Sequence, residues 1–180
     1  MKAATQKLPG PAAGTVAMNE GLATLVFERT LAHPPATVWA ALTDPRELRE
    51  WFLATSVKID GRPGGSIEML AGPPQIRSTG RILTWDPPRV LEYEWKVAPR
   101  PEHPDGEDSV VRWELTAVGS STRLKLTHRR LSEAVAMGFV AGLHAFLDRL
   151  EAQLDGAPLP DWMQRFGELH PGYAANAPEC

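Results

Sequence analysis

The chain has 180 residues, of which 43% are hydrophobic and 23% are charged, as is typical of a protein with one hydrophobic core. Its formal net charge of −3, without a long run of lysine and arginine, argues against nucleic acid or an anionic membrane surface as the main partner. No window approaches the roughly 20 apolar residues of a membrane span, and residues 1–21 contain no apolar signal-peptide segment, so we expect a cytoplasmic protein. The only cysteine, Cys180, excludes an intrachain disulfide.

Both ends of the chain differ in composition from the middle. Residues 1–21 are rich in Ala, Gly, Pro and Thr and predict a flexible N-terminal tail, whereas residues 157–180 contain four prolines and predict an extension. The single domain is therefore expected to span residues 22–156. Within the extension, we expect a short amphipathic turn that packs back onto this domain through Leu159, Trp162, Met163 and Phe166.

The first strand is predicted over residues 22–31, and two short helices follow it directly. Pro34 and Pro35 favour the start of a helix whose apolar face carries Val38, Trp39 and Leu42.

A second helix is predicted to start about ten residues after the first. Asp44 is expected to cap the new helix, Pro45 to be its first residue and Glu47 to complete a capping box. Leu48, Trp51 and Phe52 then share one face, so the segment predicts two consecutive helices joined at a kink.

Six further strands are predicted from runs in which apolar and polar residues alternate. They span residues 56–59, 66–70, 77–85, 90–97, 110–117 and 122–129, which gives seven strands in all. In the run over 90–97, Leu91, Tyr93 and Trp95 alternate with charged residues, so one face of the sheet is apolar and the other solvated. An antiparallel sheet with one apolar face needs a cover.

The cover is predicted to be one long helix over residues 132–154. Apolar residues recur there at helical spacing, Ser132 is a candidate N-cap, and Gly156 is placed to end the helix. The fold class is therefore α+β, with a curved antiparallel β-sheet wrapped around a long C-terminal α-helix and two short helices after the first strand.

The helix pair also resembles a known family. The pattern P-P-x-x-V-W-x-A-L-T-D-P-x-x-L-x-x-W-F is similar to the opening of the START-like (SRPBCC) superfamily, in its branch named for the activator of Hsp90 ATPase homologue. His33 departs from this pattern, because many relatives carry Ala there. The similarity extends over about residues 22–156 and includes Gly80-Arg81-Ile82, the turn over 85–89, Tyr93, Trp95 and the terminal segment 142–156.

The resemblance implies the helix-grip fold and a cavity between the sheet and the long helix, which in this superfamily commonly holds a small apolar molecule. We therefore expect binding of a small hydrophobic ligand that is lipid-, polyketide- or aromatic-like. The alternative for each residue is ordinary core packing. The residues expected to line the cavity are Met69, Tyr93, Trp95, Trp113, Leu115, His128, Phe139, Leu143 and Phe146.

Three of the expected positions carry further information. Many relatives carry Trp where Leu143 stands, so this chain is expected to have a larger cavity or to refill the gap from Phe139 or Phe146. His128 is the main polar candidate for a ligand contact, with a satisfied core histidine as the alternative. His144 is expected to pair with Asp148 on the surface of the long helix.

Two other functions remain open at this point. Some superfamily members are cyclase- or hydrolase-like enzymes, but the five histidines show no metal spacing, and no catalytic motif or phosphate loop occurs, so we expect no cofactor and no metal and assign no catalytic residue. Glu92, Glu94 and Glu114 are expected on the solvated face. The family name suggests an Hsp90-type chaperone as partner, although the similar eukaryotic co-chaperone has a separate N-terminal domain for which residues 1–21 are too short.

Overall fold

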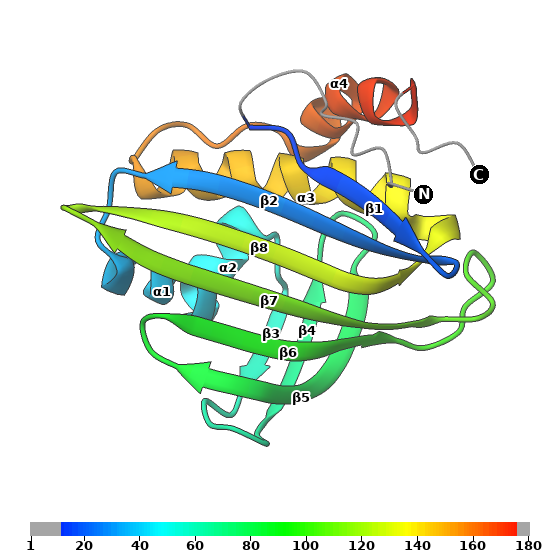
Figure 1. The fold of residues 1–180 in the computed structure, drawn as a ribbon, viewed down its shortest axis with the longest axis horizontal. Coiled ribbons are helices and arrows are strands. Elements are labelled where there is room, and N and C mark those ends of the chain that lie inside the picture. The colour runs from blue at the N-terminus through cyan, green and yellow to red at the C-terminus, as the bar shows by residue number, and fades with distance from the viewer. Residues whose placement is uncertain (1–11, 176–180) are drawn as a thin grey trace.

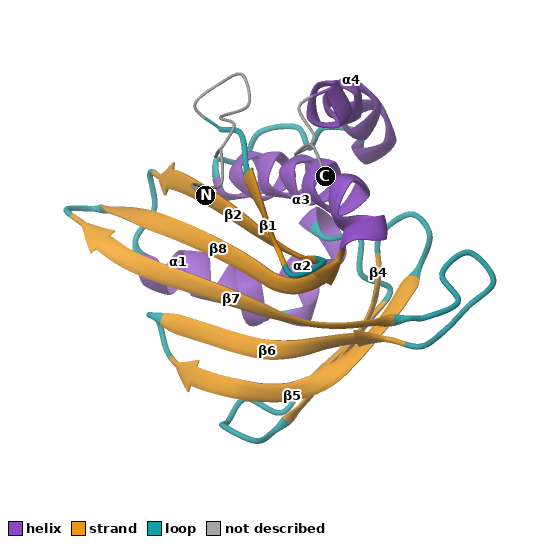
Figure 2. Cartoon of the chain, turned by 45° about the vertical axis from the view of Figure 1, so that its right-hand side comes forward, coloured by secondary structure: helices purple, strands orange, loops and turns teal. Residues whose placement is uncertain are grey.

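The computed structural model describes residues 12–175 and contains one antiparallel sheet curved around a long helix (Figures 1 and 2). The eight strands lie in the order β1-β2-β8-β7-β6-β5-β4-β3. The predicted fold class is thus confirmed, with one strand more than expected. None of the helices within residues 12–175 is long and apolar enough to cross a membrane. The strands are β1 (Thr15–Asn19), β2 (Leu22–Leu31), β3 (Ser56–Ile59), β4 (Ser66–Ala71), β5 (Ile76–Asp86), β6 (Val90–Val97), β7 (Glu107–Val118) and β8 (Ser121–Ser132).

The extra strand, β1, comes from the segment that was assigned to the N-terminal tail. Thr15–Asn19 pairs antiparallel with β2, and a two-residue turn with positive φ at both Glu20 and Gly21 joins the strands. The tail assignment is therefore wrong for these residues, because β1 hydrogen-bonds to an edge of β2 that would otherwise be unpaired. Residues 1–11 of the expected tail lie outside the described residues.

Helices α1 (Pro35–Thr43) and α2 (Pro45–Trp51) confirm the predicted helix pair. Asp44 caps α2 by accepting a hydrogen bond from the backbone N–H of Arg46. The second half of the capping box is absent, because the Asp44 N–H already donates to the Ala40 carbonyl of α1. Glu47 instead accepts a hydrogen bond from the side chain of Gln153 and so ties α2 to the long helix.

The long helix is α3 (Glu133–Leu154), and it crosses the concave face of the sheet (Figure 2). Gly156 follows its end with a φ of 65°, as predicted for a residue that terminates a helix. Ser132 begins the helix, but its hydroxyl donates to Glu107 of β7 instead of capping the first turn. The start of α3 is thereby anchored to the sheet.

The C-terminal extension contains a fourth helix, α4 (Trp162–Ala175), which is longer than the predicted turn and lies along α3 (Figure 1). Tyr173 is its buried anchor: the phenolic oxygen accepts a hydrogen bond from the Gly14 N–H at 2.9 Å and lies 2.7 Å from Nδ1 of His144. Met163, which was expected to pack inward, is 60% exposed. Residues 176–180 of the expected extension lie outside the described residues.

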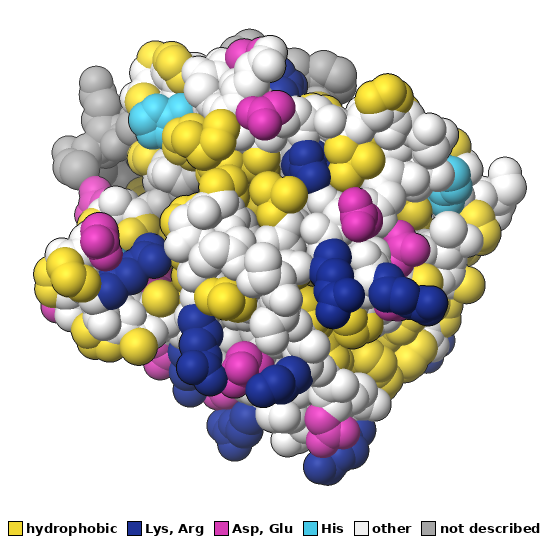
Figure 3. All heavy atoms as spheres, turned by 180° about the vertical axis from the view of Figure 1, so that it is seen from behind, with side chains coloured by type: hydrophobic (Ala, Val, Ile, Leu, Met, Phe, Trp, Pro, Cys, Tyr) yellow, Lys and Arg dark blue, Asp and Glu magenta, His cyan; other side chains and the backbone are white. Residues whose placement is uncertain are grey.

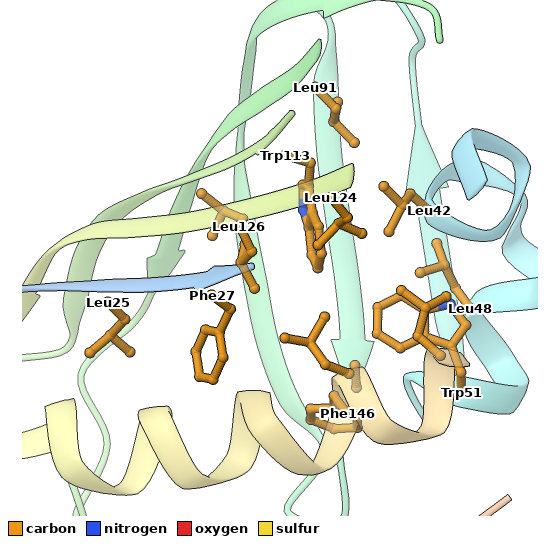
Figure 4. Packing of buried hydrophobic residues seen from close by; sticks show 14 of the residues in the cluster. Leu25, Phe27, Leu42, Leu48, Trp51, Leu91, Trp113, Leu124, Leu126 and Phe146 are labelled. Atoms are coloured by element: carbon orange, nitrogen blue, oxygen red, sulfur yellow. The ribbon is translucent and has the colours of Figure 1, made fainter. Parts of the chain in front are cut away.

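The core between sheet and helices combines leucines with large aromatic side chains (Figure 4). Trp51 of α2 is 1% exposed, and its Nε1–H donates to the Ala41 carbonyl at 2.8 Å. Its ring lies edge-on to Trp113 of β7 and Phe146 of α3, with centroid separations of 6.3 and 6.4 Å. This cluster therefore connects α2, the sheet and α3 at one end of the candidate site.

Candidate functional site

A cavity of about 360 Å³ lies between α3 and the concave face of the sheet. The sheet side is formed by β6, β7 and β8 with the adjoining ends of β4 and β5, and the helix side by one face of α3. The end of α2, the turn between β4 and β5, and the first residue of α4 contribute the remaining lining. The volume lies in the range of small-molecule sites, about 300–1,000 Å³.

The lining includes seven of the nine residues that the sequence analysis placed at the cavity. Four of them come from the sheet, and three come from α3 at positions one turn apart. The strand alternation and the helical spacing thus identified the inner face. The seven are Tyr93, Trp95, Trp113, His128, Phe139, Leu143 and Phe146.

Met69 and Leu115 do not line this cavity. Met69 borders a much smaller space beneath α2, of about 10 Å³, together with Trp51 and Trp113. Leu115 is 4% exposed within the core and lies opposite Leu124 of β8. Both side chains are on the apolar face of the sheet, as expected, but at positions along the strands where other core residues cover them.

The lining also contains residues that the sequence analysis did not assign to it. Most are small or apolar residues whose contribution depends on how the loops fold, so no local pattern distinguishes them. The clearest omission is Trp162, which was expected only to pack against the domain. These residues are Phe52, Ala71, Gly72, Pro73, Pro74, Ile76, Ser78, Val111, Ala134, Val135, Gly138, Gly142 and Trp162.

Trp162 of α4 fills space next to Gly142 of α3. A Cβ atom built at Gly142 would lie 3.2 Å from Cζ2 of Trp162, so a side chain at this position would push the indole away. The Trp162 ring also packs on Phe146, with a centroid separation of 5.3 Å. Phe139, Leu143 and Phe146 all border the open cavity, and Trp162 of the C-terminal extension, which was not expected there, makes α4 part of the cavity wall.

His128, at the inner end of β8, is the most buried polar residue of the lining, with 2% of its surface exposed. Its Nε2 lies 2.8 Å from the Ser109 hydroxyl of β7. Trp95 and Phe139 pack edge-on against the imidazole, with centroid separations of 5.5 and 5.7 Å. Burial lowers the pKa of His128 to about 3, so the ring is neutral at physiological pH.

We expect the buried histidine to make unfolding depend on pH. Because the pKa of His128 is about 3 in the folded state and about 6.5 in a model peptide, the unfolded chain binds more protons between these values. Stability should therefore fall as the pH drops below about 6.5, by at most about 1.4 kcal/mol per pH unit for this group. Urea unfolding at pH 6.5, 6.0 and 5.5 measures the slope. His128→Gln should reduce it, and an unchanged slope in the variant would show that His128 titrates normally.

His144 lies on the opposite side of α3 from the cavity and is buried under α4, not exposed as expected. Nε2 lies 3.6 Å from Asp148, so the predicted pair exists, while Nδ1 contacts the Tyr173 hydroxyl. Burial lowers the pKa of His144 to about 4, although Asp148 opposes this shift. This histidine therefore contributes to docking of α4 and does not line the cavity.

The carboxylates of the outer sheet face are neutralised by neighbouring cations. The carboxylate of Glu92 forms ion pairs with the guanidinium groups of Arg112 and Arg129, with N–O distances of 2.8 and 2.6 Å. Glu94 pairs with Arg81 at 3.3 Å. Burial raises the pKa of Glu92, but the hydrogen bonds from the two arginines outweigh it and lower this pKa overall. Glu92 is only 8% exposed, more buried than expected for the solvated face. None of these groups lines the cavity.

An open groove adjoins the cavity where α2, the β4–β5 turn and α4 meet. It has a volume of about 470 Å³ and shares Gly72, Pro73 and Trp162 with the cavity lining. Arg49, Arg149 and Asp161 make this groove more polar than the cavity. The three shared residues place Trp162 between the groove and the apolar interior.

Comparison with known families gives one match that covers most of the chain. The family model described as Activator of Hsp90 ATPase homolog 1-like protein matches residues 32–155. This range begins just before α1 and ends with α3, so it includes most of the cavity lining but not Trp162. No curated protein matches the chain.

Several solved structures share the fold over nearly their whole length. CalU16 from Micromonospora echinospora is 28% identical, with a TM-score of 0.69 over 96% of this chain and 97% of that protein. The protein encoded by BPP1335 from Bordetella parapertussis is also 28% identical, with a TM-score of 0.69 over 99% of this chain and 97% of the other. MLL2253 from Mesorhizobium loti is 26% identical, with a TM-score of 0.65 over 76% of this chain and 99% of its own.

Proposed function

The chain belongs to the family of Activator of Hsp90 ATPase homolog 1-like proteins, and from this premise we propose that it binds a small hydrophobic molecule in the cavity between the sheet and α3. The observation that carries the proposal is the lining itself. Aromatic rings from β6, β7 and α3 surround a space of about 360 Å³ that these side chains do not fill. A residue set that served only as core would close such a space, because protein interiors pack to the density of organic crystals.

The chemistry of the lining favours an apolar ligand. Among the described residues that form it there is no aspartate, glutamate, lysine or arginine. Tyr93 is protonated at physiological pH, because burial raises its pKa to about 12, and its oxygen accepts a long hydrogen bond from Trp113 at 3.5 Å. The site therefore supplies a large apolar contact area with a few polar groups that can orient a ligand.

Catalysis in the same cavity is supported less well. Ser109 and His128 are adjacent, as a nucleophile and its base would be, but the Ser109 hydroxyl donates to the Trp95 carbonyl at 3.1 Å. Ser109 is also outside the lining, and no group within the described part of the chain orients Nδ1 of His128. The pair therefore lacks the arrangement of an activated hydroxyl, and we propose binding, not turnover.

Docking to an Hsp90-type chaperone is the other role suggested by the family name. The outer sheet face carries carboxylates and arginines that pair with one another. On the face opposite to the view of Figure 1, lysine and arginine side chains again lie beside aspartate and glutamate (Figure 3). No charge pattern on these surfaces singles out a partner, so this role has less support than ligand binding.

The experiment that tests the proposal fills the cavity from α3. In Leu143→Trp a larger side chain enters the space, and we expect at least a tenfold loss of affinity for an uncharged apolar probe such as 2-methoxynaphthalene or 2-naphthol. Isothermal titration calorimetry measures the affinity, and unfolding in urea confirms that the variant is folded. The matched control is Leu83→Trp, since Leu83 is 42% exposed on β5 and outside the lining.

The control variant should bind as the original protein does. Equal affinity in Leu143→Trp and Leu83→Trp would place the bound probe elsewhere on the molecule. Absence of binding in all three proteins, for these probes and for fatty acids and flavonoids, would remove the proposed function.

A further inference from the structure

Two buried nitrogens of the cavity lining, Nδ1 of His128 and Nε1 of Trp162, have no hydrogen-bond partner among the described residues. The indole nitrogen of Trp162 can only donate, whereas the imidazole of His128 already uses Nε2 in its contact with Ser109 and leaves Nδ1 without a partner within residues 12–175. Most buried polar atoms in proteins have a partner, and leaving one unmatched costs about 1–3 kcal/mol. His128 is 98% removed from solvent in the wall of a cavity proposed to take a ligand, so a ligand group is a natural partner.

The neighbouring hydrogen bonds define which kind of partner Nδ1 requires. The Ser109 hydroxyl has one proton, and it donates that proton to the Trp95 carbonyl at 3.1 Å. The contact of 2.8 Å between Ser109 and Nε2 of His128 is then satisfied only if Nε2 carries the hydrogen and donates to Oγ. In a neutral imidazole the other nitrogen has no proton. Nδ1 is therefore an acceptor and needs a donor.

The surroundings of His128 exclude a charged partner. Burial keeps the ring neutral, since its pKa is lowered to about 3, and no charged side chain is present in the described lining. A carboxylate brought into this cavity would lose its hydration without gaining a counter-ion. A carboxylate also carries no proton to donate to Nδ1. A fatty-acid anion thus matches the apolar walls but not the polar group.

Resting on the proposed function, we infer that the ligand is an uncharged ring compound bearing a hydroxyl group, which donates a hydrogen bond to Nδ1 of His128. The two rings that pack edge-on against the imidazole, Trp95 and Phe139, are only partly buried. Both rings line the cavity, and the inference requires that they shift to expose Nδ1 when a ligand enters. His128 then acts as the residue that selects hydroxylated ligands over apolar ones of the same shape.

A pair of probes isolates the hydroxyl group. 2-Naphthol and 2-methoxynaphthalene share the same fused rings and an oxygen, but only 2-naphthol can donate a hydrogen bond. We expect the original protein to bind 2-naphthol about tenfold more tightly, which corresponds to one hydrogen bond worth about 1.4 kcal/mol. 2-Naphthoate, which is anionic at pH 7, should show no saturable binding. Isothermal titration calorimetry with the full chain measures all three.

Two variants of His128 distinguish the roles of its two ring nitrogens. The side-chain amide of Gln reaches the position of Nε2 and keeps a donor for Ser109, but it removes the acceptor at Nδ1. The amide oxygen of Asn lies near the position of Nδ1 and keeps that acceptor, but it loses the bond to Ser109. His128→Gln should therefore bind both probes with similar affinity, and His128→Asn should keep the preference for 2-naphthol. Circular dichroism and urea unfolding verify that each variant is folded.

The possible results distinguish this inference from the function on which it rests. Binding of both probes with the same affinity ratio in the original protein and in His128→Gln would overturn the role of His128 and leave ligand binding intact. Tighter binding of 2-naphthoate than of 2-naphthol would overturn the inferred ligand class. If neither naphthalene binds the original protein, this inference fails, and the proposed function fails with it only if the fatty acids and flavonoids do not bind either.

Discussion

Trp51→Ala should lower the free energy of unfolding by about 3–5 kcal/mol, the cost of truncating a large aromatic side chain in a packed core. Trp51 is 1% exposed, and its ring contacts Trp113 and Phe146, which both line the cavity. Its removal also leaves the Ala41 carbonyl without the indole donor. Urea unfolding followed by circular dichroism measures the change.

The matched control for this substitution is Trp39→Ala. Trp39 of α1 is only partly buried and packs edge-on against Trp85, at a centroid separation of 5.1 Å. Trp39→Ala should lower the free energy of unfolding by less than half as much as Trp51→Ala. If both variants lost the same free energy of unfolding, the partly buried Trp39 would stabilise the protein as much as Trp51 does. That result would contradict the central position of Trp51 in the core.

Arg149→Ala should be the second most damaging substitution, with an expected loss of about 3 kcal/mol for a buried cation whose hydrogen bonds are all removed. The guanidinium of Arg149, on α3, donates to three backbone carbonyls: Trp51 at 3.0 Å, Glu50 at 2.6 Å, and Pro160. It thereby holds the end of α2 and the segment before α4 against α3. Removing it leaves three carbonyls unmatched.

Arg149→Lys should recover little of this stability, because one ammonium group cannot reproduce the planar array of donors. The control is Arg46→Ala, which removes an exposed arginine at the start of α2 and should unfold at the same urea concentration as the original protein. If Arg149→Lys were as stable as the original, charge alone would explain the effect of Arg149, and the carbonyl contacts would not matter. Because Pro160 precedes α4, Arg149→Ala should also weaken binding through displacement of Trp162.

The parts of the fold that were predictable rest on strong local signals. Asp44 followed by Pro45 is a sequence typical of a helix start, since Asp caps the first turn and Pro fits the first helical position. Gly156 adopts the positive φ that often terminates a helix. The alternation in β6 places Tyr93 and Trp95 on the inner face because successive strand side chains point to opposite sides. These features depend only on residues that are neighbours in the sequence, so they can be predicted without knowledge of the tertiary structure.

The errors arise where distant parts of the chain decide the outcome. Met69 and Leu115 lie on the predicted face, but which part of that face α3 leaves open depends on the curvature of the sheet. Strand β1 is short, and its pairing with β2 depends on a two-residue turn. The place of Trp162 in the cavity wall could not be inferred, since it depends on how α4 docks on α3 through contacts such as that of Tyr173 with Gly14.

The central claim is that the cavity between the sheet and α3 binds a ligand, and the six tryptophans of the chain allow it to be tested directly. Three indoles line the cavity, those of Trp95, Trp113 and Trp162, whereas Trp39 and Trp85 pack on each other outside its lining. In ¹⁵N-labelled protein, each indole N–H gives a separate NMR signal that can be followed during titration with 2-naphthol. We predict saturable shifts of the three cavity signals, with those of Trp39 and Trp85 unchanged. Shifts confined to Trp39 and Trp85, or no saturable shift at any indole, would contradict the claim.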